Sequence, residues 1–99
     1  MSGASLIAAE RERQIADKGY TPNHDDTHTL GQLAEGAICY AYAAYYDRCD
    51  IPSNWPFEDA AWKPCDDPIR NLVKAGAMIA AEIDRLQRMP KQQPQQNAV

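Results

Sequence analysis

Several features that assign a chain to a special class of protein are scarce or missing in this sequence. The 3 cysteines, Cys39, Cys49 and Cys65, are an odd number without a Cys-x-x-Cys spacing. This argues against a disulfide framework or a cysteine zinc site and fits a reducing compartment. No apolar run approaches the roughly 18 residues of a membrane span, and residues 1–9 lack the basic and apolar regions of a signal peptide. We therefore expect a cytoplasmic protein with no membrane partner.

Positive charge and glycine are also in short supply. The 10 Lys and Arg residues face 14 Asp and Glu residues, which gives a net charge of -4. Proteins that bind DNA or RNA need the opposite balance, so no nucleic acid polymer is expected as a partner. A local basic pocket for a small anion is compatible with this total. The 5 glycines form no phosphate loop, and no nucleophile motif is present, so we expect no catalytic residue and no cofactor.

What the sequence does contain is helical patterning over a length of 99 residues, enough for one domain. A first helix is expected over residues 5–18, with Gly19 as a left-handed helix end. Arg11 and Gln14 interrupt its apolar stripe. Either this helix packs loosely, or part of its inner face lies against something polar. The connector over residues 20–28 is expected to be a loop.

The second helix is expected over residues 29–50. Thr29 followed by Gln32 matches a capping box, in which the Thr side chain caps the helix and the Gln side chain reaches back. Residues 36–46 are apolar or aromatic almost all round the helix. Because two partner helices cannot surround a third, this excess apolar surface predicts an oligomer interface on the second helix.

The third helix is the clearest element in the sequence. Residues 51–65 hold three prolines and both tryptophans and predict a long loop. Asp67 as the N-cap and Pro68 at the first position then begin the helix. A mid-helix glycine, Gly76, predicts the close approach of another helix. The apolar positions repeat with helical spacing over five turns, at Ile69, Leu72, Val73, Gly76, Ile79, Ala80, Ile83 and Leu86.

These segments predict an all-α fold. Three main helices, with a Trp- and Pro-rich loop between the second and the third, form a single helical domain over residues 1–89. The helical hairpin is expected to assemble into a homo-oligomer. Residues 90–99 are rich in Gln and Pro and are expected to be a disordered tail.

Three clusters of residues are candidates for a functional site. His24, Asp25, Asp26 and His28 could bind a divalent metal, contact a ligand directly, or brace the start of the second helix. Arg70 and Lys74 lie four residues apart, so they project from one side of the third helix and could bind phosphate. The alternative for this pair is a solvated or internally paired face.

The third cluster is the aromatic loop. Trp55 or Trp62 could stack on a nucleobase while Lys63 meets a phosphate, or the rings could form a hydrophobic plug over the core. On the first helix, Arg11 and Gln14 are the further candidates for the pocket. Glu10 and Arg13 beside them could contribute, although a salt-bridged surface is the usual role of such a run.

A set of short motifs covers about residues 8–88: Glu10-Arg11-x-Arg13-Gln14-Ile15, Gly19-Tyr20-Thr21, His24-Asp25-Asp26-x-His28, Leu33-Ala34-x-x-Ala37-x-x-Tyr40-Ala41, Trp55-Pro56, Trp62-Lys63-Pro64 and Arg70-x-Leu72-Val73-Lys74-Ala75-Gly76-Ala77-x-Ile79-x-Ala81-Glu82-Ile83. This pattern resembles a widespread family of small phage and prophage proteins. In size and helical content the chain also resembles phage anti-defence proteins that sequester nucleotide signals, of the anti-CBASS and anti-Thoeris type. The resemblance implies a phage protein acting in the cytoplasm of the host.

The leading hypothesis is a non-catalytic homo-oligomer that binds a phosphate-bearing nucleotide, either a cyclic nucleotide or an ADP-ribose derivative. Phosphates would bind Arg70 and Lys74, and a base would stack on Trp55 or Trp62. The ribose or the edges of the base would form hydrogen bonds with His24, Asp26 and His28. One alternative is a metal-dependent phosphodiesterase that uses the histidine cluster with Glu10 or Glu82. Another is an interaction module that blocks a host protein through the Ala- and Tyr-rich second helix.

Overall fold

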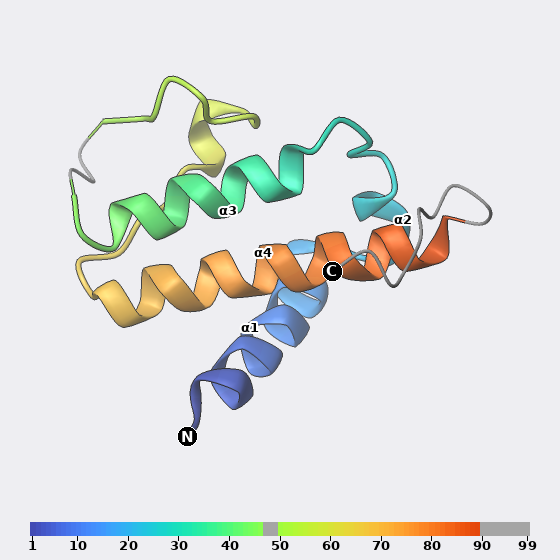
Figure 1. The fold of residues 1–99 in the computed structure, drawn as a ribbon, viewed down its shortest axis with the longest axis horizontal. Helices are drawn as coiled ribbons and strands as arrows, with labels where there is room; N and C mark the ends of the chain where they lie inside the picture. The colour runs from blue at the N-terminus through green and yellow to red at the C-terminus, as the bar shows by residue number, and fades with distance from the viewer. Residues whose placement is uncertain (47–49, 90–99) are drawn as a thin grey trace, which may run out of the picture.

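The computed structural model describes residues 1–46 and 50–89, so Cys49 and the expected tail at 90–99 lie outside the described residues. The described residues form helices and no strand (Figure 1), which confirms the all-α fold with three main helices. In chain order the elements are α1 (Gly3–Lys18), α2 (Pro22–Asp25), α3 (Gln32–Ala43), the 3-10 helix η1 (Asp59–Ala61) and α4 (Pro68–Arg88).

Helix α4 is the central element of the fold. It packs against α3, α1 and the short α2. Helices α3 and α4 run in opposite directions as a hairpin, and α1 crosses α4 obliquely with its first turns projecting from the body (Figure 1). The segment between α3 and α4 folds back along α3 and contains η1, so the expected long loop holds one short helical turn. In the described part of the chain, no helix is both long and apolar enough to cross a membrane.

The predicted C-terminal end of α1 and the predicted start of α4 are confirmed, whereas α1 begins earlier than predicted. Gly19 closes α1 with a φ of 73°, a left-handed conformation that favours glycine. The start of α1 lies two residues earlier than expected, because the Ser2 hydroxyl caps it by accepting from the Ser5 amide at 3.1 Å. At the start of α4, Asp67 Oδ1 accepts from the Ile69 amide at 2.9 Å, and Pro68 occupies the first turn.

The predicted bounds of the second helix are wrong at both ends. Thr29 makes no capping box; Gly31 precedes α3 with a φ of 80°, a conformation that interrupts any helix begun at Thr29. The Gln32 side chain instead accepts from the amide of Leu30 at 2.7 Å. Helix α3 ends at Ala43 and not at Asp50, and the chain then leaves the helix through a turn.

The connector at residues 20–28 is also more ordered than expected. Thr21 accepts from the His24 amide at 3.3 Å and Pro22 begins the helical turn α2, so a capped start was present where the sequence had predicted a loop. His28 follows α2, and the His24 and His28 rings meet edge to face at 5.1 Å. The two histidines are four residues apart in the sequence, and the turn after α2 brings their rings together although His28 lies outside the helix.

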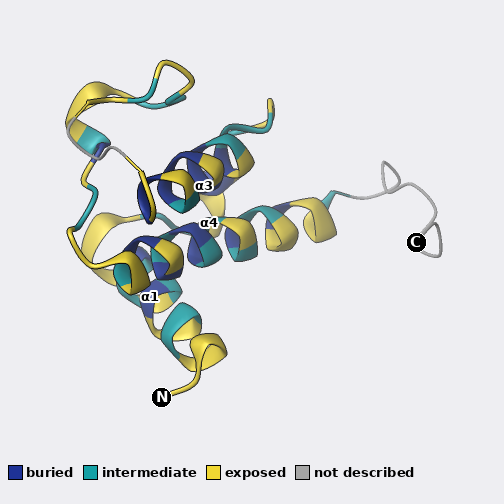
Figure 2. Cartoon of the chain, turned by 60° about the vertical axis from the view of Figure 1, so that its left-hand side comes forward, coloured by how far each residue is buried: buried dark blue, intermediate teal, exposed yellow. Residues whose placement is uncertain are grey.

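The core is built from small residues of the hairpin and from aromatic rings. Figure 2 shows buried residues of α3 and α4 concentrated where the two helices meet. The apolar stretch at residues 36–46 is therefore partly explained within one chain, while Ile38, Tyr42, Tyr45 and Tyr46 remain exposed. An interface on that exposed half of α3 stays a prediction. The core cluster consists of Ala37, Cys39, Tyr40, Ala43, Trp62 and Ala75.

Two residues of α4 fix its position relative to the rest of the chain. A Cβ on Gly76 would collide with the side chain of Ile7, which confirms the close approach of another helix, here α1. Asn71 is fully buried. Its amide nitrogen donates to the carbonyls of Cys65 at 2.7 Å and Ala43 at 3.4 Å, and its oxygen accepts from the Cys65 amide at 2.8 Å. These bonds anchor the first turns of α4, from which Arg70 and Lys74 project.

Candidate functional site

A cavity of about 600 Å³ lies between α1, α2, α3, α4 and the segment that carries η1. Of the eight lysines and arginines among residues 1–46 and 50–89, six line it, against three carboxylates, Glu10, Asp25 and Glu58. A chain with a net charge of -4 thus concentrates positive charge at one place. Such a site attracts anions. The six cations are Arg11, Arg13, Lys18, Lys63, Arg70 and Lys74.

Glu10 is the centre of the polar network at the base of the cavity. Its side chain is 1% exposed. Arg13 donates to both carboxylate oxygens at 2.9 Å, Gln14 donates to one of them at 2.9 Å, and Arg70 donates to the other. Burial alone would raise the pKa of Glu10, but the hydrogen bonds from Arg13, Gln14 and Arg70 lower it to about 2. Glu10 is therefore an ionised structural anion at neutral pH.

A second buried ion pair fixes α1 to α2. Arg11 donates to Asp25 Oδ2 at 2.6 Å and to the carbonyl of Tyr20 at 3.1 Å. Asp25 is 1% exposed. Its position follows from the capped turn of α2, which places the carboxylate within hydrogen-bond distance of Arg11 on α1. The Nε atom of Arg11 is buried and has no hydrogen-bond partner among the described residues.

Lysines supply the cations that the carboxylates do not neutralise. The Lys74 ammonium donates to the Lys63 carbonyl at 2.7 Å and lies 5.5 Å from the centre of the Tyr40 ring. Because an ammonium has three donors, Lys74 keeps capacity for a ligand. Its pKa is lowered by burial and by the charge of Arg70. In the described part of the chain, the ammonium groups of Lys18 and Lys63 have no hydrogen-bond or ion-pair partner.

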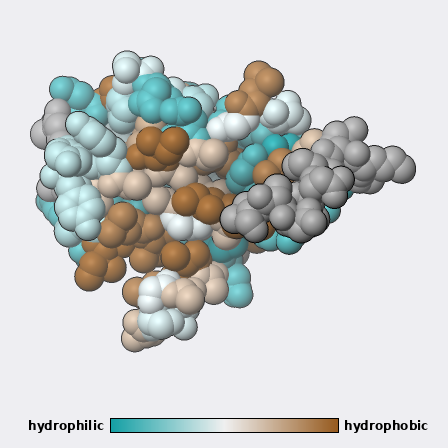
Figure 3. Space-filling model, viewed as in Figure 1, coloured by the Kyte–Doolittle hydropathy of each residue, from teal (hydrophilic) through white to brown (hydrophobic). Residues whose placement is uncertain are grey.

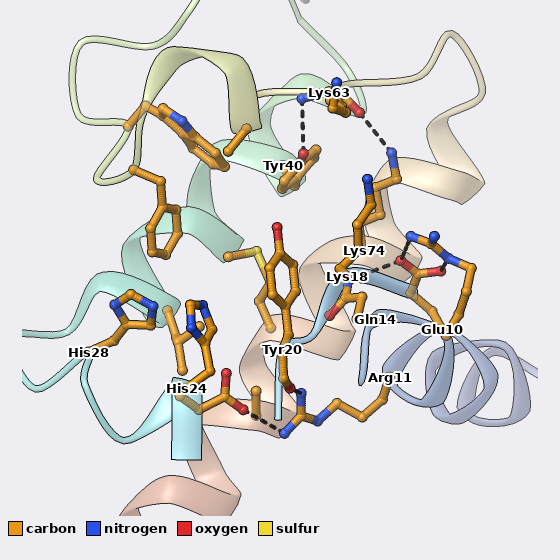
Figure 4. Close-up of a pocket in the computed structure, with 18 of the residues that line it drawn as sticks. Glu10, Arg11, Gln14, Lys18, Tyr20, His24, His28, Tyr40, Lys63 and Lys74 are labelled. Carbon is orange, nitrogen blue, oxygen red and sulfur yellow. Dashed lines mark hydrogen bonds and ion pairs between the residues drawn. The ribbon is translucent and has the colours of Figure 1, made fainter. Parts of the chain in front are cut away.

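Aromatic rings form the opposite side of the cavity. Each ring contacts the next with centroid separations of 5.1–5.6 Å, from Tyr20 to His24, His28, Phe57, Trp55 and Tyr40. Figure 4 shows the two histidines on one side, the lysines and Glu10 on the other, and Tyr20 between them. Burial and the neighbouring His24 lower the pKa of His28, which favours its neutral form at pH 7. The cavity therefore pairs an aromatic wall with a cationic wall.

Most residues proposed from the sequence line this cavity. Arg70 and Lys74 of α4, His24 and His28, Trp55, Lys63, and Arg11 and Gln14 of α1 all belong to its walls. Asp26 and Trp62 do not. Asp26 is exposed and pairs with Arg88 at 2.6 Å, and Trp62 packs in the core against Tyr40 and Trp55. The two tryptophans thus take separate roles, since Trp62 is the hydrophobic plug and Trp55 faces the cavity.

Several lining residues were not proposed from the sequence, including Lys18, Tyr20 and Tyr40. The interruption of the apolar stripe on α1 was the available signal for the polar side. Glu10 and Gln14 are the buried residues of α1, which confirms that part of its inner face lies against polar groups. Nothing in the spacing of Tyr40 distinguished it from an ordinary core residue.

The histidine cluster does not assemble as a metal site. Asp25 is bound to Arg11, Asp26 points away to Arg88, and the histidine rings are engaged by their aromatic neighbours. Among residues 1–46 and 50–89, no three His, Cys, Asp or Glu side chains converge as metal ligands. Comparison with protein-family models, with curated proteins and with solved structures finds no match to this chain.

Proposed function

We propose that this protein binds a small phosphate-bearing nucleotide in the cavity between α1, α3 and α4. The observation that carries the proposal is the pairing of an aromatic wall with a cationic wall in one cavity of about 600 Å³. A nucleotide has both complements, since a base stacks on aromatic rings and a phosphate binds ammonium and guanidinium groups. Pockets that bind small molecules span roughly 300–1,000 Å³, so the volume suits a mononucleotide-sized or larger ligand.

The hydrogen bonds within the cavity indicate which side chains are available to bind a phosphate and which are available to stack on a base. Arg13 and Arg70 both donate to the carboxylate of Glu10, whereas the lysines of the cavity pair with no carboxylate in the described part of the chain. Lys74, Lys63 and Lys18 are therefore the better phosphate ligands. Trp55 and Phe57, which meet at 5.3 Å, offer the surface for a base.

Retention of the nucleotide is favoured over its hydrolysis. The two buried carboxylates, Glu10 and Asp25, are each bound to arginine, and a carboxylate held in this way is a weak general base. A cyclic nucleotide or an ADP-ribose derivative that serves as a host defence signal is the ligand class that the resemblance to small phage proteins implies. The proposed function is therefore sequestration of such a signal.

The test is a binding experiment that also reports the chemical state of the ligand. Purified protein is incubated with cyclic mononucleotides, cyclic dinucleotides and ADP-ribose derivatives, and tryptophan fluorescence is followed, because a base on Trp55 would quench it. The bound fraction is then denatured and identified by mass spectrometry. We expect one class to be retained intact. Release of a cleaved product would support the phosphodiesterase alternative, and no retention of any nucleotide would support a module that binds a host protein.

A further inference from the structure

The outward face of α4 carries the larger aliphatic side chains of this helix. The buried apolar residues of α4 are smaller: Val73, Ala75, Ala77 and Ala81. On the outward face, Ile69 is 61% exposed, Leu72 39%, Ile79 49%, Ile83 51% and Leu86 38%. None of these five residues lines the cavity. The predicted apolar stripe of the third helix is thus largely on the surface of the single chain.

The spacing of this stripe is that of a helix-pairing surface. Including Gly76, successive positions are alternately three and four residues apart, which is the heptad pattern of helices that pair along a seam. At the middle of the stripe the side chain of Ile7 lies over Gly76. The surface there is therefore also aliphatic. We call the set Ile69, Leu72, Ile79, Ile83 and Leu86, with Ile7, the outer α4 stripe.

Together with the exposed surface of α3 beside it, the outer α4 stripe approaches the area that each partner of a stable dimer buries. Five aliphatic side chains near half exposure present on the order of 500 Å² of apolar surface, as large as the largest patch of a typical monomer. Figure 3 shows hydrophobic side chains gathered over α4, with others over α3 on the same face. On α3, Ile38 and Tyr42 are more than half exposed. Together these helices can approach the roughly 800 Å² that each partner buries in a stable complex.

We infer that a second copy of this chain covers the outer α4 stripe, with the two α4 helices antiparallel. The alternating spacing of three and four residues is the same in either direction along the helix. In an antiparallel pair Ile69 lies opposite the partner's Leu86, and Leu72 lies opposite the partner's Ile83. Ile79 lies opposite the partner's Gly76, where the side chain of Ile7 forms the surface. The surface is thus self-complementary, as a two-fold dimer requires.

The partial charges of the helix termini favour the same orientation. An antiparallel pair brings the positive N-terminal end of one α4 near the negative C-terminal end of the other, whereas a parallel pair would bring like ends together.

The first measurement is the mass of the protein in solution by light scattering after size exclusion. The wild type is expected to have the mass of a dimer at tens of micromolar. Ile79→Glu and Ile83→Glu are expected to raise the dimer dissociation constant at least 100-fold and so give monomers, because each would bury an unpaired charge at the interface. Their circular dichroism should match the wild type, since both positions are exposed in the single chain.

Leu30→Glu is the matched control, because Leu30 is 86% exposed and precedes α3, away from α4. It should remain a dimer. Orientation is tested by mixing two monomeric variants, Leu72→Lys and Ile83→Glu. In the antiparallel pair the introduced charges face each other, so the mixture should recover a heterodimer, whereas mixing Ile83→Lys with Ile83→Glu should not.

Three results would overturn the inference. A wild-type monomer at tens of micromolar would mean that no second copy covers this surface. Dimers in both the Ile79→Glu and Ile83→Glu variants would place the interface elsewhere, and loss of the dimer in Tyr42→Glu alone would place it on α3. Recovery only in the mixture of the two Ile83 variants would mean that the helices run parallel.

Discussion

Replacement of Glu10 by alanine should lower the free energy of unfolding by about 3–5 kcal/mol. The carboxylate is 2% exposed and binds Arg13, Gln14 and Arg70. Its removal leaves Arg70 without its counter-charge, Arg13 with only the more distant carboxylate of Asp17 at 4.0 Å, and Gln14 without its acceptor. For a domain of this size the melting temperature should fall by roughly 15 °C or more. Thermal unfolding followed by circular dichroism measures the change.

Glu12→Ala is the matched control for Glu10→Ala. Glu12 belongs to the same helix and carries the same charge, but it is exposed and makes no ion pair within the described residues. Its substitution should change the free energy of unfolding by no more than about 0.5 kcal/mol. Equal effects of the two substitutions would mean that the buried network contributes no special stability.

The stability of the protein should also depend on pH through Glu10. The pKa of Glu10 is about 2 in the folded chain and 4.5 in the reference state. A lowered folded pKa gives stability that is present above about pH 4.5 and is lost as the pH falls toward 2, amounting to about 3 kcal/mol. Urea unfolding of Glu10→Gln between pH 6 and pH 2 should lack this part of the acid destabilisation. A wild-type pH dependence that the variant reproduces would contradict the assignment.

Replacement of Lys74 by methionine should weaken nucleotide binding roughly 10- to 150-fold, the equivalent of one charged hydrogen bond to phosphate. The Lys74 ammonium is half-buried in the cavity and retains donors beyond its bond to the Lys63 carbonyl. Methionine keeps a flexible apolar stem beside Tyr40, so the melting temperature should change by only a few degrees. Titration of the tightest ligand of the nucleotide panel, followed by tryptophan fluorescence, measures the loss.

Arg88→Met separates a local contact from a general charge effect. It removes the same charge from α4, but Arg88 lies outside the cavity and pairs with Asp26 at the surface. The dissociation constant of the Arg88→Met variant for the nucleotide should stay within about two-fold of the wild-type value, because exposed ion pairs and distant charges contribute little at physiological salt. If Arg88→Met weakened binding as much as Lys74→Met, the lysine would act only through net charge. Arg70→Ala, by contrast, should reduce both stability and binding because Arg70 also holds Glu10.

The parts of the fold that local chemistry determines could be predicted from the sequence. Asp67 with Pro68 and the glycine at 19 marked helix ends that the structure confirms. The start of α3 could not be predicted in the same way. Thr29 and Gln32 satisfy the pattern of a capping box, yet the left-handed backbone at Gly31 separates them. A pattern of residue types does not reveal which φ angle a glycine between them adopts.

Prediction of the cavity failed mainly where a residue's role depends on distant partners. Arg70 and Glu10 are 60 positions apart, and no local pattern indicated that they pair. For the same reason the sequence left open whether Arg70 binds phosphate or is paired within the fold, and only the structure shows its ion pair with Glu10. The tryptophans show the same limit. Trp55 and Trp62 occur in similar Pro-rich surroundings and both contact Tyr40, so only their burial in the folded chain distinguishes the core ring of Trp62 from the cavity ring of Trp55.

The cavity takes its walls from residues as far apart as Glu10 and Ala81. No contiguous piece of the chain could hold the ligand, so the unfolded chain has no affinity for it. Any ligand of the cavity must then raise the unfolding free energy of the whole domain, by about 2.7 kcal/mol at a free concentration of 100 times its dissociation constant. For a chain of 99 residues this corresponds to a rise of roughly 10–20 °C in the melting temperature. Occupancy of the cavity and survival of the fold are thus thermodynamically linked, and a protein saturated with its ligand should resist proteolysis better than the empty chain.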